Sequence, residues 1–166
     1  MKVLGIDPGL AQTGWAVVEQ GQDTQSFTLR GAGLIKTTPG ESLPQRLQRI
    51  QSTLTQVLKE HAPQSVAIEE IFFLKAAKSI LGTSQARGVI LVATTQSGVP
   101  LSEYNPRQVK IVLTGNGQAK KNQMQKMIQM LLKLHSPPRP DDVADAMAIA
   151  LCHLRSNRYK KLICLK

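Results

Sequence analysis

Hydrophobic residues along the chain follow two kinds of pattern, short apolar runs and longer stretches with helical spacing. Residues 3–7 begin with an apolar run, Val3-Leu4-Gly5-Ile6, which is typical of a strand buried on both faces of a sheet. In residues 41–61 the apolar positions recur at helical spacing and predict an amphipathic helix. The same reasoning predicts strands at residues 3–7, 13–19, 26–36, 65–69 and 101–104, and helices at residues 41–61, 75–97, 106–113, 122–134 and 141–154.

The lengths of the connections predict how the strands are arranged. Only a few residues separate the first two predicted strands, so these strands should form an antiparallel hairpin. The helix at 41–61 makes a crossover connection, so the strand at 65–69 should lie parallel to the first strand. If these two strands are neighbours, Asp7 and Glu69 emerge at the same end of the sheet, where open α/β sheets place their ligand sites.

A carboxylate ends each of these two strands. Asp7 is followed by Pro8 and Gly9, which stop the strand, and a charge at the tip of a buried strand is costly unless a cation or hydrogen-bond donors meet it. Two acidic tips side by side would repel each other unless a metal ion neutralised the pair. Structural roles fit as well, because Asp7 can cap the Pro-Gly turn and Glu69 or Glu70 can begin the next helix. Glu70 suits that helix-starting role better.

The net charge of +10 is distributed unevenly. Residues 1–103 carry nine Lys or Arg and eight Asp or Glu, whereas residues 104–166 carry twelve and three. A basic C-terminal half is typical of a protein that binds nucleic acid, although a ribosome-like or merely soluble basic surface has the same composition. The three acidic residues of that half lie together and indicate a cation site inside a phosphate-binding surface. Asp142 and Asp145 share a helix face, and Asp141 is the natural N-cap.

The chain of 166 residues suffices for one domain with a hydrophobic core, which we place at residues 1–154. Residues 155–166 are expected to form a basic, loosely ordered C-terminal tail. The longest apolar patch, residues 88–93, is too short to span a bilayer, and the N-terminus carries no signal-peptide pattern. Cys152 and Cys164 lack the spacing of a zinc site, so we expect reduced thiols and a cytoplasmic protein without membrane contact.

Several residues suit contacts to DNA. Phe72 and Phe73 closely follow the acidic strand tip and could stack on the bases of a distorted nucleic acid, although one of them can equally belong to the core. Residues 114–119 form a loop that either holds a phosphate with its backbone N–H groups or is an ordinary connector, and they do not match a Walker A loop. The expected DNA-contacting residues are Phe72, Phe73, Lys75, Lys78, Arg87, Arg107, Lys110, Lys120 and Lys121.

Five motifs together closely resemble the RuvC family of Holliday-junction resolvases: GIDPGLAQTGWAVV, VAIEEIFF, SQARGV, RQVK and PDDVADAMAIA. The resemblance covers residues 2–153, with the motifs in the right order and spacing. It implies an RNase H-like α/β fold, with a mixed five-stranded sheet flanked by helices on both faces. It also implies a homodimer that resolves four-way DNA junctions by paired symmetric nicks, and a branch-migration helicase complex as partner. The helix at 75–97 is rich in small residues and is the expected dimer interface.

The resemblance also assigns metal binding and catalysis to particular carboxylates. Where the family has one carboxylate before the last helix, this chain has two, and the D-x-x-D spacing selects Asp142 over Asp141. Glu70 could add charge near the site. His153 lies two helical turns beyond Asp145, and either approaches the site or is structural. The expected metal-binding and catalytic carboxylates are Asp7, Glu69, Asp142 and Asp145.

Ligands that offer only oxygen favour Mg²⁺ or Mn²⁺ over zinc. We expect two Mg²⁺ ions, about 4 Å apart and bridged by Asp7, with Mn²⁺ as a substitute. They would promote in-line hydrolysis that leaves a 5′-phosphate and a 3′-hydroxyl. By the resemblance, Phe72 stacks at the junction centre, while Lys110 and Lys121 are the catalytic and DNA-contacting lysines. Lys121 is the one that we expect to offset charge on the pentacoordinate phosphorus.

Two other functions fit part of the pattern. An ATPase of the actin and sugar-kinase type also places a phosphate loop after a strand-end Asp-x-Gly, but it needs two such domains and a second glycine-rich loop, which this chain lacks. A module that binds DNA junctions without cutting them is disfavoured by the four carboxylates, which weaken DNA binding unless a metal ion compensates. Metal-dependent nicking distinguishes the three functions.

Overall fold

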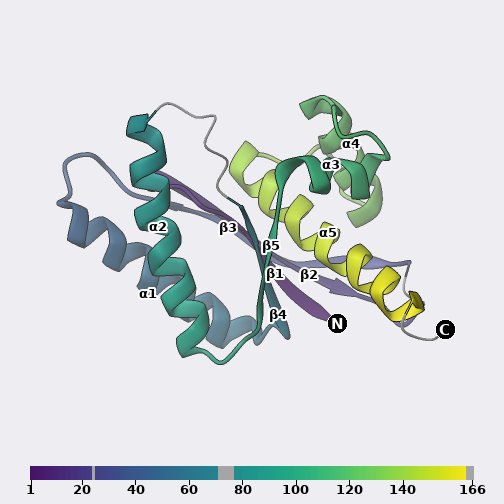
Figure 1. The fold of residues 1–166 in the computed structure, drawn as a ribbon, viewed down its shortest axis with the longest axis horizontal. Coiled ribbons are helices and arrows are strands. Elements are labelled where there is room, and N and C mark those ends of the chain that lie inside the picture. Colours follow the sequence, from purple (N-terminus) through teal and green to yellow (C-terminus); the bar gives the residue numbers. More distant parts are fainter. Residues whose placement is uncertain (24, 71–76, 164–166) are drawn as a thin grey trace.

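The computed structural model describes residues 1–23, 25–70 and 77–163, with the backbone alone described at residues 77–79 and 157–163. The described strands are β1 (Lys2–Asp7), β2 (Gln12–Gln20), β3 (Phe27–Lys36), β4 (Ser65–Glu69) and β5 (Leu101–Tyr104). The described helices are α1 (Leu43–His61), α2 (Ala77–Gln96), α3 (Pro106–Thr114), α4 (Lys121–Leu132) and α5 (Asp141–Ile163). The strands form a five-stranded sheet in the order β3-β2-β1-β4-β5, with helices on both faces (Figure 1).

Strand β1 lies at the centre of this sheet. It pairs antiparallel with β2 and parallel with β4, so the sheet is mixed, and the predicted hairpin and crossover are both confirmed. Strand β3 extends the antiparallel side, and β5 extends the parallel side. Ile6 lies opposite Ile68 in the pairing of β1 with β4. Asp7 and Glu69, the next residues of the two strands, therefore leave the sheet at the same end.

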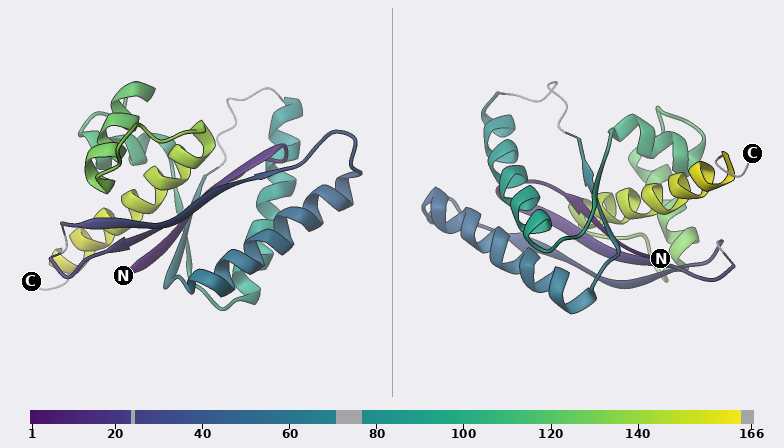
Figure 2. Two further views of the ribbon diagram at one scale, coloured as in Figure 1. Left: turned by 180° about the vertical axis from the view of Figure 1, so that it is seen from behind. Right: turned by 60° about the horizontal axis from the view of Figure 1, so that its bottom comes forward.

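Two helical layers enclose the sheet. Helices α1 and α2 cover one face, and α3, α4 and α5 cover the other (Figure 1, Figure 2). Side chains of β1 alternate between the layers, because Leu4 and Ile6 pack with residues of α1 and α2 whereas Val3 packs with residues of α5. Both faces of β1 are thus buried in apolar cores, which is why its sequence is a continuous apolar run.

Helix α5 lies unusually close to the sheet, over two glycines that face it. A Cβ atom on Gly5 would lie 2.1 Å from the carbonyl oxygen of Ala146, and one on Gly14 would lie 2.0 Å from that of Asp142. Any other residue at these positions would push the helix away. A glycine inside a strand indicates such a close approach of another backbone, but the sequence analysis drew nothing from Gly5 or Gly14.

The last helix is longer than the sequence predicted. Residues 155–163, which were expected to be loosely ordered, continue α5 as far as Ile163. No glycine or proline follows Leu154, so the sequence contains no signal that would end the helix there. The predicted boundary at Leu154 is therefore wrong, while residues 164–166 lie outside the described part of the chain.

Cys152 is a free, buried thiol, and Cys164 lies outside the described residues. Within the part of the chain that the structure describes, no helix is both long enough and apolar enough to cross a membrane.

Candidate active site

Three elements bring acidic residues to one end of the sheet. Asp7 ends β1, Glu69 ends β4, and the first turn of α5 carries Asp142, with Asp145 three residues later. Asp7 lies beside Gly14 in the sheet, and the backbone of Asp142 rests on that same glycine. The close approach of α5 to β2 therefore places Asp142 next to the end of β1.

Asp7 and Glu69 belong to the sheet face that α5 covers. Val3 and Gly5, at alternate positions before Asp7, both face α5. Ala67 packs in the same core, and Glu69 follows it on the same side because strand side chains alternate. Both carboxylates are half-buried. The predicted meeting of the two strand tips is thus confirmed at the level of the backbone.

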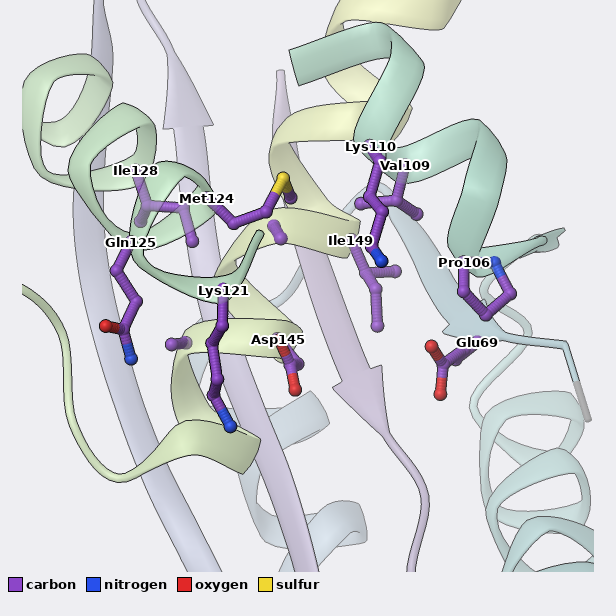
Figure 3. A pocket seen from close by; sticks show the side chains of 12 residues that line it. Glu69, Pro106, Val109, Lys110, Lys121, Met124, Gln125, Ile128, Asp145 and Ile149 are labelled. Carbon is purple, nitrogen blue, oxygen red and sulfur yellow. The ribbon is translucent and has the colours of Figure 1, made fainter. Parts of the chain in front are cut away.

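A cavity of about 240 Å³ opens at this end of the molecule. Glu69 of β4 and Asp145 of α5 reach it from two sides, and Lys110 of α3 points into it between them (Figure 3). Lys121 of α4 also lines it, so the cavity combines two acidic and two basic side chains. The wall is completed by Pro106, Val109, Met124, Gln125, Ile128, Ala144, Ala148 and Ile149.

The acidic residues supply the oxygen donors that Mg²⁺ and Mn²⁺ prefer. Among the described residues, no group of three or more His, Cys, Asp or Glu side chains is placed to hold a metal ion. Glu69 and Asp145 share the cavity, whereas Asp7 and Asp142 lie at the same sheet end without lining it. Mg²⁺ keeps several waters and is usually held by one or two carboxylates together with substrate phosphates. The carboxylate donors therefore fit a magnesium site of this kind.

Asp141 forms an ion pair with Lys121, and its expected role as N-cap of the last helix is wrong. Its Oδ2 lies 2.7 Å from Lys121 Nζ, and its Oδ1 accepts a hydrogen bond of 3.1 Å from Gln125 Nε2. The hydrogen bond from Lys121 lowers the pKa of Asp141, and the same hydrogen bond raises the pKa of Lys121. The cap is instead Pro140, whose carbonyl oxygen accepts from the N–H groups of Val143 and Ala144.

Helix α3 carries Lys110 to the cavity. The helix begins at Pro106, which needs no N–H partner, after Asn105, whose side chain accepts a hydrogen bond of 2.9 Å from the N–H of Arg107. Arg107 is exposed, while Lys110, one turn later, is half-buried. The N-cap thus fixes the start of the helix that aims Lys110.

The loop after α3 is tied together by hydrogen bonds. Gly115 ends the helix with a φ of 75°, which favours glycine. Asn116 then accepts from the N–H of Gln118 at 2.9 Å and from the N–H of Ala119 at 3.1 Å. Lys120 is exposed directly after this turn. Phosphate binding by this loop stays a prediction.

Of the remaining residues that were predicted to contact DNA, the side chain of Arg87 is described and several others are not. Phe72, Phe73 and Lys75 lie outside the described residues, and the side chain of Lys78 is likewise not described. Arg87 of α2 pairs with Glu103 of β5 at 2.5 Å, and only 19% of its side chain is exposed. This ion pair joins a helix to the sheet and favours a structural role for Arg87 over a contact to DNA.

His153 is buried and makes a contact that the sequence analysis did not identify. The hydroxyl of Tyr104, at the end of β5, lies 2.9 Å from His153 Nδ1, and the two rings meet edge to face. Burial raises the pKa of Tyr104 to about 12. Since β5 pairs with β4 at Tyr104 and Glu69, this contact holds α5 against the strand end next to the site. Of the two roles left open for His153, the contact favours the structural one.

Known proteins of one family are similar to this chain in sequence. A family model described as "Crossover junction endodeoxyribonuclease RuvC" matches residues 3–153. Proteins of that name from Endomicrobium trichonymphae and Pelotomaculum thermopropionicum are 47% and 43% identical to this chain. The first alignment covers 94% of this chain and 82% of the relative, and the second covers 100% of both.

A solved structure of the same family is similar to this chain in fold. The structure of T. thermophilus RuvC in complex with Holliday junction substrate is 38% identical to this chain, with a TM-score of 0.91 and 96% of each chain covered. The mixed-sheet, RNase H-like α/β fold that the resemblance implied is confirmed.

Proposed function

The chain belongs to the RuvC family of crossover junction endodeoxyribonucleases, and we propose that it resolves four-way (Holliday) DNA junctions at the cavity between β4, α3, α4 and α5. The observation that carries this proposal is the meeting of two acidic residues with two lysines in a cavity of a chain that matches the family over residues 3–153. Lysines alone would bind DNA without cutting it, and carboxylates alone would repel it. Together they suit metal-dependent hydrolysis of a phosphodiester bond.

Four carboxylates supply the oxygen donors of the proposed metal site. Asp7, Glu69, Asp142 and Asp145 would hold two Mg²⁺ ions, and Mn²⁺ would substitute. When bound, the ions would activate the attacking water and stabilise the leaving 3′ oxygen, which gives 5′-phosphate and 3′-hydroxyl ends. Two donors come from strand ends and two from the start of a helix, so their backbone positions are fixed by the fold.

The two lysines would act on the phosphate itself. Lys110 is half-buried and points into the cavity between Glu69 and Asp145, so its ammonium group can neutralise a phosphate oxygen placed there (Figure 3). Lys121 reaches the cavity from α4, and its charge would stabilise the pentacoordinate phosphorus. Both lysines belong to helices, so the fold fixes their backbone positions.

Residues around the cavity would guide the DNA. Arg107 and Lys120 are exposed near Lys110 and Lys121 in sequence, and they suit contacts to the phosphate backbone. Phe72, Phe73, Lys75 and Lys78 follow Glu69 in the sequence, and stacking by Phe72 at the junction centre is proposed from the family resemblance alone. A branch-migration helicase as partner is proposed on the same ground.

A homodimer would give the junction two sites. A four-way junction has two-fold symmetry, and a two-fold dimer presents one site to each of two opposed strands. Helix α2 offers a suitable surface, because Leu81 is 64% exposed and Val92 is 49% exposed. Ser84 and Gly88 lie between them at helical spacing and leave room for a second helix.

A synthetic four-way junction tests the proposed function. The purified protein, incubated with Mg²⁺, Mn²⁺ or a chelator, should nick the junction only when a divalent ion is present. Asp7→Asn should bind the junction normally but cleave it roughly 100-fold more slowly, or worse, because a metal ligand is lost. Glu60→Gln is the matched control, since Glu60 is an exposed carboxylate on α1, and it should cleave like the parent protein.

Four outcomes would contradict the proposal. Cleavage in the presence of the chelator, or cleavage undiminished by Asp7→Asn, would show that the proposed metal site is wrong. Binding without any cleavage would favour a junction-binding module, and phosphate release from ATP would favour an ATPase.

A further inference from the structure

Both carboxylate oxygens of Asp141 are engaged by helix α4. Oδ2 pairs with Lys121 Nζ at 2.7 Å, and Oδ1 accepts from Gln125 Nε2 at 3.1 Å. Lys121 and Gln125 are four residues apart and so share one face of α4, and both line the cavity. Asp141 itself does not line the cavity. Its carboxylate thus faces the two side chains that form one wall of the site.

We propose that Asp141 is a positioning residue that acts through Lys121, holding the lysine ammonium group at the cavity and away from the metal-binding carboxylates. The inference rests on the proposed role of Lys121 in cleavage. It also separates the three acidic residues at the start of α5 by task. Asp142 and Asp145 would serve the metal ions, while Asp141 serves the lysine.

The physical need for such a residue follows from the lysine side chain. A lysine has four rotatable bonds and a compact charge that pairs with any nearby carboxylate. Asp142 and Asp145 both attract the ammonium group of Lys121. An ammonium group that settled on either of them would compete with a divalent cation for the same oxygens. The ion pair at 2.7 Å gives the ammonium group a partner, Asp141, outside the proposed metal-binding set, and the hydrogen bond from Gln125 fixes the orientation of that partner.

The ion pair contributes little to stability, and this makes the inference testable. The side chains of Lys121 and Asp141 are 57% and 54% exposed, and exposed pairs stabilise proteins only weakly. Asp141→Asn should therefore fold like the parent protein, which circular dichroism and the thermal midpoint would verify. A fall in its activity then reports on the site and not on folding.

A double-mutant cycle on junction cleavage tests the proposal. Lys121→Met should lower kcat by roughly 100-fold, because a charge next to the scissile phosphate is lost. Asp141→Asn should lower kcat by roughly 10-fold, with KM for the junction unchanged, because Lys121 is misplaced but present. In the Lys121→Met background, Asp141→Asn should have no further effect. Glu19→Gln, which breaks the exposed pair with Arg30 at 2.6 Å, is the control and should change neither background.

The outcomes separate the proposal from the function on which it rests. If Asp141→Asn lowers kcat further in the Lys121→Met background, Asp141 acts on its own, for example as a metal ligand, and positioning through Lys121 is wrong. If Asp141→Asn alone has no effect, positioning is also wrong, while a slow Lys121→Met variant would still support the catalytic lysine. Undiminished cleavage by Lys121→Met would overturn both roles, and no cleavage by the parent protein would overturn the proposed function itself.

Discussion

Gly14 controls how closely α5 approaches the sheet. A Cβ atom at this position would lie 2.0 Å from the carbonyl oxygen of Asp142, and that backbone atom moves only if the start of α5 moves. We expect Gly14→Ala to lower the free energy of unfolding by about 3 kcal/mol. Cleavage at saturating Mg²⁺ should also slow, because the helix turn that carries Asp142 is displaced. Urea unfolding and junction cleavage at one temperature measure the two effects.

Gly40→Ala is the control for this substitution. A Cβ atom at position 40 would meet no heavy atom within 4 Å, so we expect a change in unfolding free energy within about 0.5 kcal/mol. Equal unfolding free energies and cleavage rates for Gly14→Ala and Gly40→Ala would show that the close packing of α5 on Gly14 is wrong.

Single residues differ in how far the sequence reveals their roles. Asp7 and Glu69 could be identified because a charge at the end of a buried apolar run is costly, and this cost is visible without coordinates. Gly14 could only have been suspected, since a glycine in a strand does not indicate which backbone approaches it. The partner of Asp141 could not be predicted, because Lys121 is far away in sequence and meets it only through the placement of α4 beside α5.

At the scale of elements, Tyr104 and His153 tie β5 to α5 beside the site. Their hydrogen bond of 2.9 Å is buried, so removing the hydroxyl deprives a buried ring nitrogen of this partner. Tyr104→Phe should lower the free energy of unfolding at pH 7 by about 1 kcal/mol. The edge-to-face contact of the rings is kept by the phenylalanine, which makes the hydroxyl the only group tested. An unchanged denaturation midpoint of Tyr104→Phe would show that this hydrogen bond does not stabilise the contact between β5 and α5.

The same hydroxyl predicts a loss of stability at high pH. Burial raises the pKa of Tyr104 to about 12, against about 10 for a tyrosine in an unfolded chain. Below pH 10 the phenol is protonated in both states, so its contribution is intact. Between pH 10 and 12 the unfolded chain loses the proton first, and stability falls. Unfolding of Tyr104→Phe should therefore depend less on pH in this window than unfolding of the parent protein.

Absorbance titration checks the cause of this pH dependence. The chain contains two tyrosines, so the difference between the parent protein and Tyr104→Phe isolates the Tyr104 phenol. We expect that phenol to ionise near pH 12. Ionisation near pH 10 would contradict its burial.

Elements were predictable where one pattern dominates. The helix at α1 shows regular spacing of buried residues, and the observed start at Leu43 and end at His61 lie close to the predicted ones. The C-terminal part of α5 was missed because a polar, basic stretch has no apolar periodicity by which a helix is recognised. The position of α5 over β1 and β2 depends on side-chain sizes in three elements at once, which no single stretch of sequence contains.

At the scale of the molecule, the sheet brings together residues that the chain keeps apart. Asp7 and Glu69 become neighbours through the parallel pairing of β1 and β4, and Asp145 joins them from the last helix. The basic C-terminal half supplies both lysines of the cavity, while the N-terminal half supplies Asp7 and Glu69. The pairing of β1 with β2 and the parallel direction of β4 could be predicted from connection lengths and the handedness of crossovers. The homodimer rests on the family resemblance and on the small residues of α2, and it stays a prediction.

The proposed dimer gives the last prediction. Leu81 and Val92 on α2 are already exposed in the single chain, so the double substitution Leu81→Asp and Val92→Asp should leave the fold intact. Four added charges per dimer would face each other across an α2–α2 contact, and sedimentation should then show a monomer. Met130→Asp is the matched control, because Met130 is 72% exposed on α4 and lies outside the proposed contact. It should sediment like the parent protein.

Junction cleavage by the same variant tests what the dimer does. A monomer keeps the acidic and basic side chains that line the cavity, Glu69, Lys110, Lys121 and Asp145. It should therefore still nick a junction, but it should lose the pairing of the two nicks that resolution requires. A negatively supercoiled plasmid that extrudes a cruciform would report this loss as nicked circles in place of linear product. A dimer that persists in the double variant would exclude α2 as the interface, and linear product from a monomer would show that symmetric cleavage does not depend on two sites held together.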